Sequence, residues 1–311
     1  MKILIVSGFL GAGKTSLIKA MAKNTGRKFA IIENEFSEFS VDGPLLESFR
    51  DKEANIEDLE ITELSEGCIC CTGKVDFQST VVTVQNAINP DYLVVEPSGV
   101  AHPSMILSNL RPILYEQIRI LAPITIIDAN NFKKARKEFM EYFDDQLNTA
   151  RIVILSKSEN LTVDEIKRIK DDLGIGEDKF FPLEHYSNWT REDWDRLFKE
   201  ELVFGEDDYQ YVEDEAEKAN ETPMLNMAIR PFGVKSIDHL IYLLDQINTG
   251  DYGDIYRAKG FTGSGDTALR FEYVGGTYEI TGFDTEEEPV AVVIGKTLKR
   301  RRLKELFDSV K

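Results

Sequence analysis

The sequence predicts an α/β domain with a mostly parallel sheet, followed by a small α+β domain at the carboxyl end. Over residues 1–205, short apolar runs alternate with longer helical patterns, and a glycine-rich loop follows the first run. Over residues 222–311, short strands separated by turn residues predominate. Strand–helix alternation implies right-handed crossovers between parallel strands, whereas closely spaced strands imply antiparallel pairing.

The elements of the first domain follow from the spacing of its apolar residues. Runs rich in Ile, Leu and Val are typical of strands that helices cover on both faces. They predict strands at residues 2–6, 29–33, 92–96, 124–128 and 152–156. Helical spacing predicts helices at residues 15–23, 75–88, 132–142 and 162–173.

The rest of the chain divides into a linker and the second domain. Residues 206–221 (EDDYQYVEDEAEKANE) are acidic without a clear apolar period, which indicates an interdomain linker or a solvated surface helix. In the second domain, Gly275-Gly276 between alternating strands indicates a tight hairpin. Strands are predicted at residues 224–229, 256–261, 269–274, 277–281 and 289–294, and helices at 237–247 and 298–307.

The charge of the chain disfavours two classes of binding partner. The 37 basic and 55 acidic residues give a net charge of −18, which disfavours nucleic acid or an anionic membrane surface as the main partner. No apolar run reaches the length of a transmembrane helix, and the amino end is typical of a strand rather than a secretory signal. We therefore expect a cytoplasmic protein with no nucleic-acid and no membrane partner.

Residues 8–15 (GFLGAGKT) match the phosphate-loop pattern G-x-x-x-x-G-K-[ST], between a predicted strand and a predicted helix. Glycines let backbone N–H groups point at phosphate oxygens, and the helix amino end adds positive charge. Lys14 is expected to reach the β- and γ-phosphates, and the Thr15 hydroxyl to bind Mg²⁺. The loop predicts a P-loop NTPase domain that binds a nucleoside triphosphate through Gly8, Gly11, Ala12, Gly13, Lys14, Thr15 and Ser16.

Glu96 and Gly99 extend the predicted nucleotide site. Glu96 ends a strand, where an acid can hold a Mg²⁺-bound water, and the Gly99 N–H can approach a γ-phosphate. The alternative is a strand-ending turn built on Pro97. With this segment included, the predicted catalytic residues are Lys14, Thr15 and Glu96.

A base-reading segment is predicted after the strand at residues 152–156. Ser156, Lys157 and Glu159 stand where many GTPases have Asn-Lys-x-Asp. A carboxylate accepts two hydrogen bonds from guanine, and adenine lacks that donor pair, so we favour guanine over adenine. The alternative is a charged loop that leads into the next helix.

All the cysteines of the chain lie together, at Cys68, Cys70 and Cys71, which no disulfide framework would require. Thiolates are soft ligands suited to Zn²⁺ or Cu⁺. C-x-C-C supplies fewer ligands than a closed structural zinc site, so a metal held there could leave. A redox-sensing thiol set and a turn with buried thiols are the alternatives. The candidates that could complete the ligand set are Glu33, Glu35, Glu38 and His102.

The three histidines give weaker signals. His102 precedes Pro103, a position more typical of helix entry than of a metal ligand. His185 and His239 have no ligand-like spacing, and we expect surface or core positions for them.

These motifs together resemble those of the CobW-like GTPases, relatives of the metallocentre-assembly GTPases. The resemblance covers nearly the whole chain and implies a GTPase domain joined to a small C-terminal domain. It also implies metal ligands in the thiol cluster, above all Cys70, assisted by Glu33 and Glu38. The matching segments are GFLGAGKTSLI at 8–18, IIENEF at 31–36, GCICCTG at 67–73, VEPSGV at 95–100, IIDANNF at 126–132 and YRAKGF at 256–261.

The resulting hypothesis is a slow GTPase that acts as a metallochaperone. It couples Mg²⁺-GTP to the binding of Zn²⁺ or Co²⁺ at the CxCC motif, for delivery to a client metalloprotein. Two other functions stay open: an ATP-dependent activator or kinase for a small molecule or corrinoid enzyme, and a non-enzymatic metal or redox sensor. Preference for ATP over GTP would favour the ATP-dependent activator or kinase. A function that persists in Lys14→Ala would favour the non-enzymatic sensor.

Overall fold

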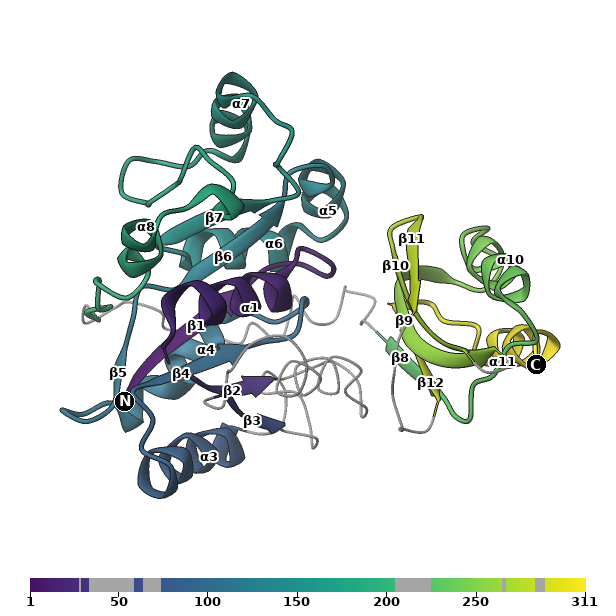
Figure 1. Ribbon diagram of the computed structural model, residues 1–311, viewed down its shortest axis with the longest axis horizontal. Coiled ribbons are helices and arrows are strands. Elements are labelled where there is room, and N and C mark those ends of the chain that lie inside the picture. The colour runs from purple at the N-terminus through teal and green to yellow at the C-terminus, as the bar shows by residue number, and fades with distance from the viewer. Residues whose placement is uncertain (28, 34–58, 64–73, 205–224, 265–266, 283–288) are drawn as a thin grey trace, which may run out of the picture. The chain divides into compact units, whose positions relative to one another are not determined.

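The computed structural model describes residues 1–27, 29–33, 59–63, 74–204, 225–264, 267–282 and 289–311. These residues form two compact units, each described here by itself (Figure 1). The first lies before the gap at residues 205–224 and the second after it. The predicted linker at 206–221 therefore lies outside the described residues, and the domain boundaries stay predictions.

The first unit contains a parallel sheet with strand order β3-β2-β4-β1-β6-β7, in which the short β5 also pairs with β1. Each strand pair of the described chain in this sheet is parallel, so the carboxyl ends of the strands share one edge. The strands are β1 (Lys2–Ser7), β2 (Phe29–Glu33), β3 (Leu59–Glu63), β4 (Tyr92–Glu96), β5 (Arg119–Ile120), β6 (Ile124–Asp128) and β7 (Ile152–Ser156).

Helices cover both faces of this sheet (Figure 1). They are α1 (Lys14–Thr25), α3 (Lys74–Ala87), α4 (Pro103–Leu110), α5 (Phe132–Glu138), α6 (Met140–Thr149), α7 (Val163–Leu173) and α8 (Arg191–Arg196). Two short 3-10 helices, η1 (Arg111–Ile113) and η2 (Tyr186–Asn188), complete the unit.

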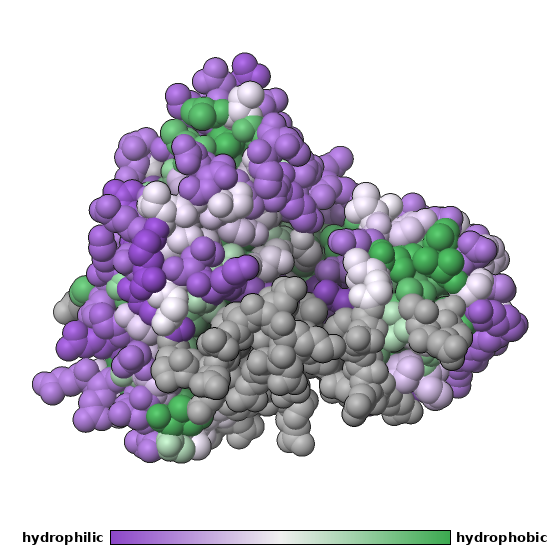
Figure 2. Space-filling model, viewed as in Figure 1, coloured by the Kyte–Doolittle hydropathy of each residue, from purple (hydrophilic) through white to green (hydrophobic). Residues whose placement is uncertain are grey.

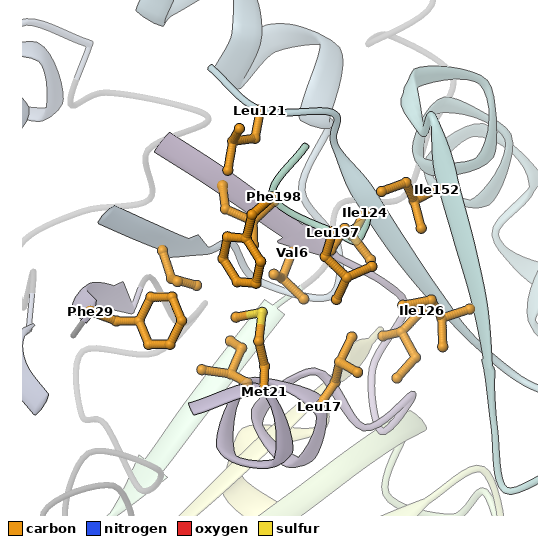
Figure 3. Close-up of a cluster of buried hydrophobic side chains, with 14 of the residues drawn as sticks. Val6, Leu17, Met21, Phe29, Leu121, Ile124, Ile126, Ile152, Leu197 and Phe198 are labelled. Atoms are coloured by element: carbon orange, nitrogen blue, oxygen red, sulfur yellow. The ribbon is translucent and has the colours of Figure 1, made fainter. Parts of the chain in front are cut away.

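The core explains why β1 is apolar on both faces. Val6 packs with Leu17 and Met21 of α1 on one face, together with Phe29 and Phe198 (Figure 3). Ile3 and Ile5 pack on the opposite face with residues of α3 and α4. Because the side chains of a strand alternate between its faces, burying both requires the continuous apolar run seen in the sequence.

One predicted helix is wrong and two strands were not predicted. The helix expected at residues 132–142 is divided into α5 and α6 at Phe139, whose φ of −138° and ψ of 45° are not helical. The ring of Phe139 packs against Phe9 of the phosphate loop, with centroids 4.7 Å apart, and this contact coincides with the break. The unpredicted strands are β3 and β5.

The second unit is an antiparallel sheet with strand order β11-β10-β9-β12-β8, which confirms the predicted α+β arrangement. Residues of α10 and α11 pack on it around Phe232 and Phe271. Gly275 and Gly276, with φ of 55° and 100°, turn the chain between β10 and β11. The elements are β8 (Leu225–Ile229), α10 (Ile237–Ile247), β9 (Asp254–Ser264), β10 (Thr267–Val274), β11 (Thr277–Gly282), β12 (Val290–Lys296) and α11 (Arg300–Ser309).

The visible surface of the described residues is mostly hydrophilic, with small apolar clusters (Figure 2). Within the described ranges, no helix combines the length and apolarity needed to cross a membrane.

The Lys179 side chain caps the carboxyl end of α6. Its Nζ donates to the carbonyl oxygens of Leu147, Asn148 and Ala150 at 2.7, 2.9 and 2.7 Å. Burial disfavours the charged ammonium and lowers the pKa of Lys179. The lysine satisfies carbonyls that have no partner in the last helical turn.

We predict that Lys179→Met lowers the free energy of unfolding by about 1–2 kcal/mol, because these carbonyls lose a charged donor. Chemical denaturation measures the change. Lys170→Met is the matched control, since Lys170 pairs with Glu177, which is 96% exposed, and exposed ion pairs contribute little. Equal losses in the two variants would contradict the role assigned to Lys179.

Candidate nucleotide-binding site

The phosphate loop lies between β1 and α1, at the carboxyl edge of the parallel sheet. Gly8, Gly11 and Gly13 have φ values of 150°, 70° and 93°, which favour glycine. A Cβ on Gly8 would overlap the carbonyl oxygen of Ile126. The loop can therefore keep this shape only with glycine at position 8.

The amino end of α1 faces this loop. Gly13 is its N-cap residue, and in the described structure no side chain caps the helix and no acid lies in its first turn. Lys14, Thr15 and Ser16 form that first turn. The helix end thus offers backbone N–H groups and partial positive charge to an anion.

Lys14 and Thr15 make contacts that suit a phosphate and a magnesium ion. Lys14 is buried, and its Nζ donates to Gly8 O at 3.2 Å. The Thr15 hydroxyl donates to Oε1 of the buried Glu96 at 2.9 Å. A hydroxyl and a carboxylate are hard oxygen donors of the kind that Mg²⁺ prefers, so the pair fits that ion.

The segment after β4 packs directly on the phosphate loop. A Cβ on Gly99 would lie 2.5 Å from Leu10 N, so position 99 has no room for a side chain. From α6, the buried Gln146 side chain donates to Gly99 O at 3.1 Å and to Ala101 O at 3.3 Å. This helix therefore holds the segment in which the γ-phosphate contact is predicted.

His102 lies directly before α4, in the helix-entry position expected from Pro103. Its ring nitrogens lie 3.8 Å from carboxylate oxygens of Glu141 and Asp145, and its ring packs against Tyr142. Asp145 also accepts a hydrogen bond from Ser104 N at 3.2 Å. Helix α6 thus contacts both ends of the segment 99–104.

The predicted base-reading residues lie at the end of β7 and directly after it. The buried Ser156 hydroxyl donates to Ala12 O at 2.6 Å, which ties β7 to the phosphate loop. Lys157 has a φ of 55°, and its Nζ pairs with Asp128 Oδ2 at 2.7 Å. Asn130 Nδ2 donates to Lys157 O at 3.2 Å.

Asp128 and Asn130 were not predicted as site residues. Asp128 ends β6, and the sheet register pairs it with Ser156 at the end of β7. Its Oδ1 also accepts from Asn130 N at 2.8 Å. A polar residue at the carboxyl end of a parallel strand was the signal that could have identified Asp128.

Glu159 and His185 lie side by side, although they are far apart in the sequence and no motif connects them. Glu159 is 54% exposed, and its Oε1 lies 3.3 Å from Nε2 of the buried His185. Burial lowers the pKa of His185, and the Glu159 charge opposes that shift. A β-bridge between Ile152 and Phe180 brings the segment before His185 alongside β7.

The predicted transition-metal ligands are not described. Cys68, Cys70, Cys71, Glu35 and Glu38 lie outside the described residues, as does the side chain of Glu33. In the part of the chain that the structure describes, no group of three or more His, Cys, Asp or Glu side chains could hold a metal ion. The ligand set stays a prediction.

Comparison with known families identifies the chain. Residues 2–176 match the family described as "CobW/HypB/UreG, nucleotide-binding domain", and residues 230–311 match "Cobalamin synthesis protein cobW C-terminal domain". The chain belongs to the CobW/HypB/UreG family. The predicted resemblance to CobW-like proteins and the predicted fold class are thereby confirmed.

Two curated relatives each match about half of the chain. Zinc chaperone CobW of Sinorhizobium sp is 30% identical over 193 residues, 54% of this chain and 54% of that protein. Zinc chaperone YeiR of Escherichia coli (strain K12) is 35% identical over 161 residues, 51% of this chain and 47% of that protein. The chain thus spans about half the length of these curated relatives. A crystal structure of Zn(II)-bound YjiA GTPase from E. coli is 19% identical, with a TM-score of 0.42, and covers 100% of this chain and 99% of that chain.

We predict that Gly99→Ala destabilises the first unit by about 1–3 kcal/mol and weakens nucleotide binding, because the new methyl group displaces Leu10. Calorimetric unfolding and equilibrium nucleotide binding measure the two effects. Gly282→Ala is the control, since no atom of the described residues lies within 4 Å of a Cβ placed there. Wild-type behaviour of Gly99→Ala would show that the two segments are less closely packed than described.

Proposed function

We propose that this protein is a GTP-binding and GTP-hydrolysing metallochaperone that couples its nucleotide state to the binding of a transition-metal ion. The observation that carries the proposal is the hydroxyl–carboxylate pair of Thr15 and the buried Glu96, 2.9 Å apart beside a glycine-rich phosphate loop. Such a pair at the carboxyl edge of a parallel sheet suits a Mg²⁺-nucleotide.

In the proposed reaction, the chain binds and orients the triphosphate. The N–H groups of the loop and of the α1 amino end hold the phosphates, and Lys14 leaves Gly8 O to neutralise the β- and γ-phosphates. Thr15 would bind Mg²⁺, and Glu96 would hold a water of that ion. Mg²⁺ supplies charge neutralisation on the transferred phosphoryl group.

The proposed GTP hydrolysis is slow when no partner protein is bound. Positioning and electrostatic stabilisation supply most of the catalysis in phosphoryl transfer, and a partner often completes the stabilising charges. Gly99 is the proposed γ-phosphate contact, and loss of that phosphate would release its segment from the nucleotide.

Guanine is the proposed base. The exposed Glu159 carboxylate would accept its two N–H donors, and Lys157 would lay its aliphatic stem over the ring. The ion pair between Lys157 and Asp128 supports this placement, because it restrains the lysine beside the end of β7.

Zn²⁺ is the proposed metal cargo, ahead of Co²⁺. The support is the thiolate chemistry of Cys68, Cys70 and Cys71 and the zinc-chaperone names of the relatives. Glu33 and Glu38 would assist, and an unidentified client metalloprotein would receive the ion. The register of the sheet also supports coupling between the nucleotide and the metal. The backbone of Glu33, where β2 ends, lies opposite that of Glu96, where β4 ends.

We predict that Lys14→Ala weakens Mg²⁺-GTP binding and lowers the hydrolysis rate, each by about a hundredfold, because a buried positive charge no longer meets the phosphates. Calorimetric titration and phosphate release measure these effects. Lys23→Ala, an exposed lysine of the same helix, is the matched control. Unchanged hydrolysis in Lys14→Ala, or tighter binding of ATP than of GTP by the wild type, would overturn the nucleotide proposal.

We also predict that a non-hydrolysable GTP analogue changes the Zn²⁺ affinity by about fivefold or more, and that Zn²⁺ changes the analogue's affinity by the same factor. Competition with a chromophoric chelator measures Zn²⁺ binding with and without the analogue. Lys14→Ala should abolish the effect of the analogue and leave Zn²⁺ binding without nucleotide unchanged. Identical Zn²⁺ affinities in the wild type would refute the coupling, but not nucleotide binding.

A further inference from the structure

His185 is a buried polar side chain that has no role in the phosphate binding proposed above. Its ring is 5% exposed and packs against Tyr186, with centroids 4.0 Å apart. Tyr186 in turn packs edge-on against Trp189 and Trp194. This aromatic packing holds the imidazole in one place at the end of the segment that runs beside β7.

The hydrogen bonds of His185 define which nitrogen carries the proton. Ser187 N donates to Nδ1 at 3.3 Å, and the Ser187 hydroxyl lies 2.8 Å from the same nitrogen. Since a backbone N–H can only donate, Nδ1 is the acceptor and the proton of the neutral ring belongs on Nε2. Within the described residues, Nε2 is buried and has no hydrogen-bond partner.

The polar atom that Nε2 approaches is Oε1 of Glu159, at 3.3 Å. Glu159 itself is 54% exposed, so its carboxylate can turn toward a bound ligand while one oxygen stays near the imidazole. A glutamate has one more rotatable bond than an aspartate, and ordering that bond on ligand binding costs conformational entropy. A fixed N–H donor beside the carboxylate reduces this cost.

We propose that His185 is a positioning residue that orients the Glu159 carboxylate toward the two N–H donors of a guanine base. His185 thereby compensates for the longer side chain at the position where Asp is usual, and it is a determinant of base specificity. This inference rests on the nucleotide site of the proposed function and adds a residue from a distant segment to it.

The test compares the affinities of Mg²⁺-GTP and Mg²⁺-ITP, because inosine lacks the 2-amino donor and otherwise resembles guanosine. Wild-type protein should bind GTP more tightly than ITP. His185→Phe keeps a ring in the core but removes both nitrogens. It should weaken GTP binding by about tenfold and ITP binding by about threefold or less, since GTP loses two oriented hydrogen bonds and ITP one.

Further variants separate positioning from folding. His185→Gln keeps an N–H donor and should recover part of the preference for GTP over ITP. In a Glu159→Gln background, adding His185→Phe should reduce that preference no further, because the two residues act through one contact. His239→Phe is the matched control, since His239 also lies within 2.8 Å of a serine hydroxyl through Nδ1, but in the second unit.

The outcomes distinguish a failure of this inference from a failure of the proposed function. Equal losses of GTP and ITP affinity in His185→Phe, or no loss, would overturn the positioning role and leave the GTPase proposal intact. A wild type that binds GTP, ITP and ATP alike would instead show that Glu159 does not read guanine, and both claims would fail.

Discussion

The nucleotide site depends on how tightly the phosphate loop is enclosed by the carboxyl ends of its neighbouring strands. Gly8 lies against Ile126 at β6, and Gly99 lies against Leu10, with no room for a Cβ at either glycine. The Ser156 hydroxyl ties Ala12 to β7. Because these contacts come from separate strands, the loop shape is set before any phosphate arrives. Such preorganisation is what makes backbone N–H groups effective in stabilising charge.

Helix α6 extends this enclosure to the segment after β4. Gln146 contacts Gly99 and Ala101, and its own carbonyl accepts a hydrogen bond from Thr125, which contacts Ser7 of β1. The segment proposed to sense the γ-phosphate is therefore connected, through buried hydrogen bonds, to the strand that precedes the phosphate loop. These buried hydrogen bonds would oppose movement of that segment, because breaking them leaves buried polar groups without partners.

The parts of this site that are local in the chain could be predicted, and the parts built by distant segments could not. The strand, glycine loop and helix at Lys2–Thr25 follow from hydrophobic periodicity and a contiguous motif. The break at Phe139 was missed because apolar spacing continues across it, and the contact with Phe9 spans the fold. The approach of His185 to Glu159 likewise depends on tertiary packing, which periodicity does not encode.

The aromatic cluster beside His185 has an optical consequence. The chain contains only two tryptophans, Trp189 and Trp194, and their rings lie 4.9 Å apart in edge-on contact. Both belong to the segment that supports the proposed base-reading carboxylate. Tryptophan emission, excited at wavelengths that tyrosine does not absorb, therefore originates from this one neighbourhood. Quenching or a shift in that emission becomes a label-free signal for events at the base-proximal end of the site, without any engineered dye.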